Sequence, residues 1–105
     1  MRTAALLLFL ICVACSKASN SFVVRVDEGA ATAAKLRLCG AEVPLNKAGN
    51  RFTLVRRSSC EGAGEILIVF SDREPISCPI GYVTPGADQV VSFVVNKQGC
   101  MPLAS

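Results

Sequence analysis

The chain has 105 residues, with six cysteines, no histidine, no tryptophan and a formal net charge of +3 at pH 7. The lack of histidine excludes Ser-His-Asp and Cys-His catalytic centres and removes the commonest general base and metal ligand. We therefore expect a protein that is not an enzyme.

Residues 1–18 have the pattern of a signal peptide. A basic start at Arg2 precedes an apolar run at 4–14, and small residues at 16 and 18 suit cleavage. The run is too short to span a bilayer. The sequence predicts a single mature domain, residues 19–105, secreted or periplasmic. An alternative stays open: "VAC" at 13–15 resembles the lipobox of bacterial lipoproteins, which would lipidate Cys15 and anchor the protein on a bacterial membrane surface.

Removal of residues 1–18 takes away Arg2 and Lys17, so nine basic residues face eight acidic ones and the net charge falls to +1. The remaining basic residues are scattered and aromatic residues are few. A nucleic-acid-binding surface needs a basic face and stacking platforms, so we expect no nucleic-acid partner. No later apolar run is long enough for a transmembrane segment.

Short runs that alternate in polarity or are apolar throughout predict strands. In chain order they are 21–26, 35–39, 51–56, 65–70, 80–84 and 90–95. The alanine-rich segment 27–35 is expected to form a loop or a short helical turn capped by Asp27. Six or seven short strands predict an all-β fold: a small antiparallel β-sandwich, immunoglobulin-like, or a small barrel.

Four cysteines remain in the mature chain, and their even number predicts two disulfides in an oxidising compartment. Three pairings are possible. We favour Cys39–Cys60 and Cys78–Cys100, because each pair brackets about twenty residues around a turn signal and so would close a hairpin. With no Cys-x-x-Cys pair and no histidine, neither a metal site nor a cofactor is expected.

The segment between Cys78 and Cys100 is expected to contain a tight turn between two strands, which we call the corner. Pro85 and Gly86 suit a type II turn between strands 80–84 and 89–95. Pro79 suits an edge strand, and Gly81 suits a bulge.

These features predict a non-enzymatic binding or interaction module whose partner is another protein or a surface ligand. Function in such folds gathers at loops, here 46–50, 58–64, 71–75 and 84–88. The candidate binding residues are Arg56, Arg57, Tyr82 and Thr84. The alternative is a proteinaceous inhibitor of a secreted protease or glycosidase, because loops held by disulfides are preorganised for binding.

Overall fold

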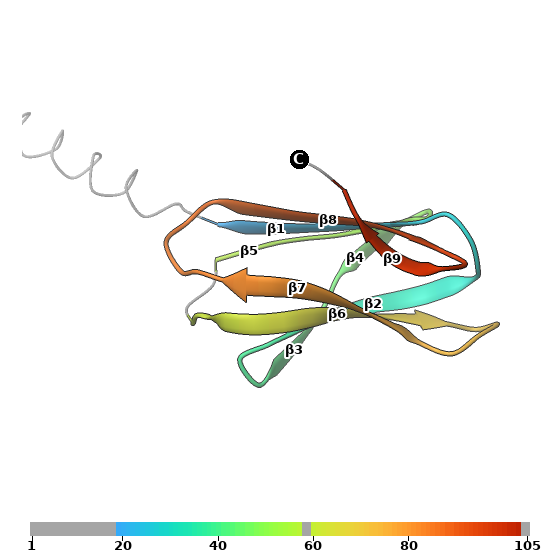
Figure 1. The fold of residues 1–105 in the computed structure, drawn as a ribbon, viewed down its shortest axis with the longest axis horizontal. Coiled ribbons are helices and arrows are strands. Elements are labelled where there is room, and N and C mark those ends of the chain that lie inside the picture. Colours follow the sequence, from blue (N-terminus) through green and yellow to red (C-terminus); the bar gives the residue numbers. More distant parts are fainter. Residues whose placement is uncertain (1–18, 58–59, 104–105) are drawn as a thin grey trace, which may run out of the picture.

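The computed structural model describes residues 19–57 and 60–103, so the predicted signal peptide and Cys15 lie outside the described residues. Over these residues two sheets pack face to face as a sandwich (Figure 1). The strands are β1 (Asn20–Val26), β2 (Ala31–Leu38), β3 (Ala41–Pro44), β4 (Asn46–Ala48), β5 (Arg51–Arg56), β6 (Gly62–Phe70), β7 (Ile76–Val83), β8 (Gln89–Asn96) and β9 (Gly99–Pro102).

One sheet has five strands in the order β4-β5-β1-β8-β9, and the other has four in the order β3-β2-β6-β7. The four-stranded sheet is antiparallel, whereas the five-stranded sheet is mixed because β1 runs parallel to β8. The all-β sandwich is thus confirmed. The expectation of antiparallel pairing throughout was wrong, and the sheets do not close into a barrel. The described residues form nine strands instead of the expected six or seven. The added strands β3, β4 and β9 have four residues or fewer, too few to show a period.

The core lies between the sheets and follows from alternation along the strands. In β1 the side chains of Phe22, Val24 and Val26 are buried and the residues between them are not. They pack against Ile66 and Ile68 of the opposite sheet in one cluster. Burying an apolar side chain of this size stabilises a fold by about 1.5–3 kcal/mol, so this alternation fixes which face of each sheet turns inward.

The segment 27–35 corrects a sequence expectation. The loop covers 27–30, and β2 begins at Ala31, so the predicted helical turn is absent. Ala34 lies opposite Ile68 and is 1% exposed. Pairing with β6 and burial between the sheets outweigh the helix propensity of alanine, which is below 1 kcal/mol per residue relative to most alternatives.

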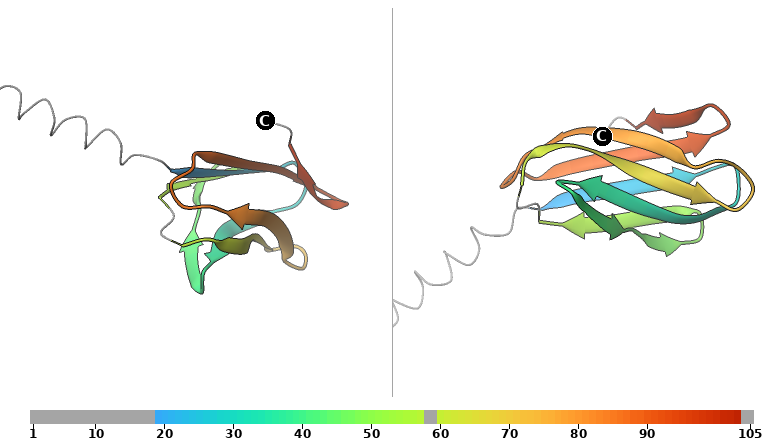
Figure 2. Two further views of the ribbon diagram at one scale, coloured as in Figure 1. Left: turned by 60° about the vertical axis from the view of Figure 1, so that its left-hand side comes forward. Right: turned by 90° about the horizontal axis from the view of Figure 1, so that it is seen from below.

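Both predicted disulfides are present, Cys39–Cys60 and Cys78–Cys100, and they indicate an oxidising, extracytoplasmic environment. They do not close hairpins. Cys78 lies on β7 and Cys100 on β9, in different sheets, and the turn at 84–88 carries the chain from one sheet to the other (Figure 2). The Cys78–Cys100 bridge therefore ties the two layers of the sandwich together, whereas Cys39–Cys60 links the turn after β2 to the segment before β6.

The predicted corner has the expected backbone. Gly86 has φ of 78°, as the third position of a type II turn requires. The bulge at Gly81 is also present: Gly64 pairs with Gly81 and Glu65 with Pro79, so Ile80 has no partner in the ladder. At this bulge Gly81 has φ of 77°, a conformation that other residues adopt at a cost.

Candidate functional site

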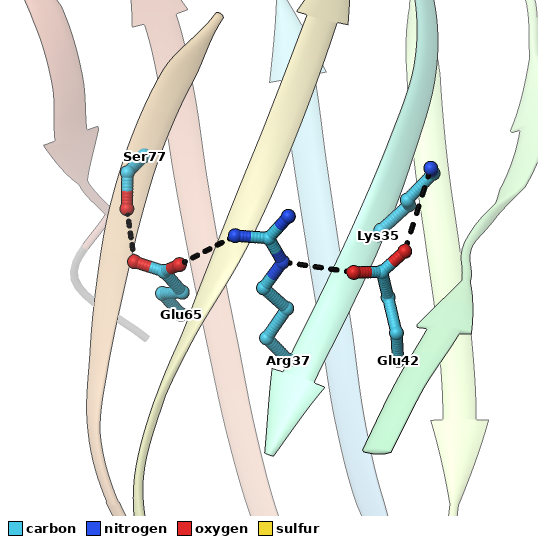
Figure 3. A network of polar contacts seen from close by, with 5 residues as sticks. All are labelled: Lys35, Arg37, Glu42, Glu65 and Ser77. Carbon is cyan, nitrogen blue, oxygen red and sulfur yellow. Dashed lines mark hydrogen bonds and ion pairs between the residues drawn. The ribbon is translucent and has the colours of Figure 1, made fainter. Parts of the chain in front are cut away.

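The outer face of the four-stranded sheet carries a chain of paired charges (Figure 3). Arg37 on β2 contacts Glu42 on β3 at 2.9 Å and Glu65 on β6 at 3.4 Å. Lys35 lies 3.4 Å from Glu42, and the Ser77 hydroxyl donates to Glu65 at 2.6 Å. The hydrogen bond from Arg37 lowers the pKa of Glu42, and the same bond raises the pKa of Arg37. Each charged group in this chain has a partner of opposite sign.

An open hollow of about 560 Å³ lies beside these charges, at the turn that holds Cys39 and Gly40. Its polar lining comes chiefly from Arg37, Glu42 and Glu65, which already bind one another. Among residues 19–57 and 60–103 no three histidine, cysteine, aspartate or glutamate side chains gather as a metal site requires. The hollow therefore offers no free charged group to a ligand.

The outer face of the five-stranded sheet has a different character, and we call it the valine face. Its members alternate with core residues of the same strands, so they point away from the core. They are Ser21, Val23 and Arg25 on β1; Arg51, Thr53 and Val55 on β5; Val90, Ser92 and Val94 on β8; and Met101 on β9.

The valine face gathers exposed apolar side chains. Of the five large hydrophobic side chains exposed in the described part of the chain, Val55, Val90 and Met101 belong to it. Leu103 extends it beyond β9, where its N–H donates to the carbonyl of Ser92. Paired positions on neighbouring strands form rows across the sheet. In the row at the start of β1, Ser21 lies between Val55 and Val90. Exposed apolar side chains gathered on one face are candidates for an interaction site on a soluble protein.

The charges of the valine face are all positive. No strand of the five-stranded sheet contains an aspartate or glutamate. Arg25 on β1 lies directly opposite Arg51 on β5, so two arginines are neighbours across the ladder. Arg25 is bound by Asp27 at 2.9 Å, whereas Arg51 makes no ion pair with any residue that the structure describes.

The edges of both sheets are unsuited to strand addition. In the five-stranded sheet, β4 has three residues and β9 has four and ends at Pro102. In the four-stranded sheet, β3 has four residues and ends at Pro44, while β7 contains Pro79 and the bulge. Short strands, prolines and bulges prevent another strand from pairing. The faces of the sheets and the loops at their ends are thus the surfaces left for a partner.

The residues predicted from the sequence lie at one end of the sandwich, away from the centre of the valine face. Arg56 and Arg57 are exposed at the end of β5. Tyr82 is 61% exposed near the end of β7, and the Thr84 N–H donates to Gln89 at 2.9 Å. No hydrogen bond, ion pair or ring contact joins the two arginines to Tyr82 or Thr84 among the described residues.

Hydrogen bonds from the start of β1 hold the turn at that end. Asn20 is 2% exposed and donates to the carbonyl of Ala87 and to the side chain of Gln89, at 3.4 and 3.1 Å. The Ser19 N–H donates to Asp88 at 2.9 Å. The turn at 84–88 is thereby fixed to the start of β1.

Sequence reasoning missed the valine face, although a signal was present. The segments 21–26, 51–56 and 90–95 contain no acidic residue, and each has valine at positions that alternate with the core-facing ones. Loop positions were favoured because function often gathers there. The three segments become neighbours only because the strands pair in the order β5-β1-β8, and this order could not be predicted from the sequence.

Within the described part of the chain, no helix is long and apolar enough to cross a membrane. Comparisons with known protein families, curated proteins and solved structures find no match for this chain.

Proposed function

We propose that this protein is an extracytoplasmic, non-enzymatic interaction module that binds another protein through the valine face. The observation that carries the proposal is the position of the exposed apolar side chains, most of which gather on this one face. A flat apolar area with arginine and without lysine or acidic residues has the composition of a protein–protein interface centre.

The opposite face supports the same choice by contrast. There Lys35, Arg37, Glu42 and Glu65 bind one another, and a partner would have to break these pairs. Separating paired charges and burying them costs free energy that a new contact must offset. The apolar surface around Val23 and Val90 carries no such cost.

The second candidate, inhibition of a secreted hydrolase, would use the loop end with Tyr82 and Thr84. An inhibitory loop is expected to protrude and to be preorganised. The fixing of the 84–88 turn by Asn20 and Gln89 satisfies the second condition. This candidate predicts measurable inhibition in a panel of secreted proteases and glycosidases, and uniform lack of inhibition would count against it.

We also propose that the sandwich is immunoglobulin-like. A disulfide between two facing sheets favours it. The absence of tryptophan from the chain counts against it, because a tryptophan packed on the inter-sheet disulfide is a hallmark of that fold.

Two matched substitutions test the proposed surface. Val90 and Tyr82 are both 61% exposed, but Val90 lies on the valine face and Tyr82 on the other sheet at the loop end. Wild type, Val90→Asp and Tyr82→Asp are immobilised and exposed to the extracytoplasmic proteins of the native cell. Urea denaturation of each variant serves as the folding control, with Val90→Ser as the replacement if the aspartate variant is unstable.

We expect wild type and Tyr82→Asp to retain the same proteins and Val90→Asp to lose them. Loss with Tyr82→Asp alone would move the site to the loop end. Equal retention by both variants, or no protein retained by wild type, would contradict the proposal.

A further inference from the structure

We propose that the protein partner of the valine face is apolar and acidic, and that one of its carboxylates binds between Arg25 and Arg51. The inference rests on the proposed function and adds the chemistry of the partner. The two arginines are direct neighbours across the β1–β5 ladder, where opposite residues of an antiparallel pair have Cβ atoms about 4.5–5.5 Å apart.

Like charges directly opposite one another destabilise a sheet. Here only one of them is compensated: Asp27 accepts from Arg25 Nε at 2.9 Å and from its terminal nitrogen at 3.3 Å. Arg51 has no ion pair with any residue in the described ranges. A carboxylate brought in by a partner would bind Arg51 and reduce its repulsion with Arg25, so the binding of an acidic group is favoured at this position.

The apolar part of the partner follows from what lies beside the arginines. In the same row across the sheet, Arg25 lies opposite Val94, and Val94 lies opposite Met101. Val94 is only 8% exposed although it points away from the core cluster, so its neighbours already cover it. Met101 lies three strands from Arg51, about 14 Å at the usual strand spacing, so a partner that binds both must cover the width of the valine face. Arginine beside apolar anchors is the usual composition of strong interface contacts.

A second copy of this chain is a weaker fit. Two valine faces in contact would bring together arginines without any acidic residue from the strands. The nearest carboxylate is Asp27, which Arg25 already binds. An anionic membrane also fits less well, because surfaces that bind membranes carry lysine and interfacial tryptophan or tyrosine, and the valine face has none of these.

Two dyes separate the apolar and acidic parts of the proposal. Anilinonaphthalene sulfonate is apolar and anionic, whereas Nile red is apolar and neutral. The variants are Arg51→Gln, Asp27→Asn and Val90→Asp. Arg56→Gln is the matched control, because Arg56 lies on the same strand, is exposed and has no ion pair with a described residue, but sits at the opposite end.

We expect Arg51→Gln to weaken binding of the anionic dye about threefold, the size of an exposed ion-pair effect, and to leave Nile red unchanged. Asp27→Asn frees Arg25 and should strengthen anionic dye binding by a similar factor. Val90→Asp should weaken the binding of both dyes, and Arg56→Gln should leave the binding of both unchanged. Backbone amide shifts on dye addition should be centred on the valine face, around Ser21 and Arg51.

The outcomes separate the two proposals. Suppose that Val90→Asp weakens the binding of both dyes, but Arg51→Gln and Asp27→Asn leave the affinity for the anionic dye unchanged. The acidic partner is then refuted, and the proposal of an apolar docking face stands. If Val90→Asp changes the affinity for neither dye, both proposals fail. A dimer in sedimentation velocity that Val90→Asp dissociates would assign the face to a second copy. Co-sedimentation with phosphatidylglycerol vesicles at physiological salt, lost in Arg51→Gln, would assign it to a membrane.

Discussion

The two disulfides should contribute unequally to stability although they close loops of almost equal length. Their cysteines are 21 and 22 residues apart, so the chain-entropy model gives each about 3 kcal/mol. Cys78 is completely buried, whereas Cys39 is exposed. Replacing Cys78 by alanine leaves a void of about one sulfur atom in the core, and a void of that size costs about 1 kcal/mol more.

We therefore expect Cys78→Ala/Cys100→Ala to lose about 4 kcal/mol of unfolding free energy and Cys39→Ala/Cys60→Ala about 3 kcal/mol. Urea denaturation measures both, with the slope compared between variants so that changes in the unfolded state are detected. Intact mass after alkylation confirms that the remaining bridge has formed. Equal losses, or a larger loss for the Cys39–Cys60 pair, would refute the reasoning from burial.

A third variant tests the cost of the backbone conformation at Cys39. Its φ of 56° lies in the left-handed region, where a residue with a side chain pays about 1–2 kcal/mol. Glycine has no such cost. Cys39→Gly/Cys60→Ala should therefore be more stable than Cys39→Ala/Cys60→Ala by about 1 kcal/mol. If the two variants have the same denaturation midpoint, the conformation of Cys39 carries no cost.

Three further predictions concern single side chains. Gly64→Ala places a Cβ 2.6 Å from the carbonyl oxygen of Arg37 and should lose about 1–3 kcal/mol in urea denaturation; an unchanged midpoint would contradict this close packing. Arg37 lowers the pKa of Glu42, so its contribution is present above the ordinary carboxyl pKa and is lost as pH falls through the lowered value. Glu42→Gln should thus destabilise the protein at neutral pH and not in acid, and a deficit that persists in acid would refute it. Asn20→Ala leaves its partners at Gln89 and in the 84–88 turn without a donor, which should cost about 1–3 kcal/mol and speed amide exchange in that turn; unchanged exchange would show that Asn20 does not hold it.

The sequence was informative about local structure and about covalent links. Alternation in 21–26 and 51–56 predicts strands that the structure contains with nearly the same bounds. The turn residue Gly86 and the bulge residue Gly81 were also predicted, because a positive φ favours glycine. Equal spacing and turn signals led to the right disulfide pairing.

What failed depends on contacts between distant segments. The parallel pairing of β1 with β8 and the strand at Ala31–Leu38 both come from neighbours far away in the chain. The two-sheet arrangement decides that Cys78–Cys100 crosses between layers instead of closing a hairpin. The valine face also escaped prediction for this reason, since Arg25 and Arg51 become neighbours only when β1 and β5 pair.

The pairing of β1 with β8 also sets the order in which the fold can be completed. Ser21 must find Val90, 69 residues later in the chain, so the centre of the five-stranded sheet remains unformed while the ribosome makes most of the protein. The four-stranded sheet, by contrast, has all its strands between residues 31 and 83. Pairings of high sequence separation form slowly. In a chain cut short before residue 89, the β1–β8 part of the surface that we assign to binding could thus not form, whereas its β1–β5 part does not depend on those residues.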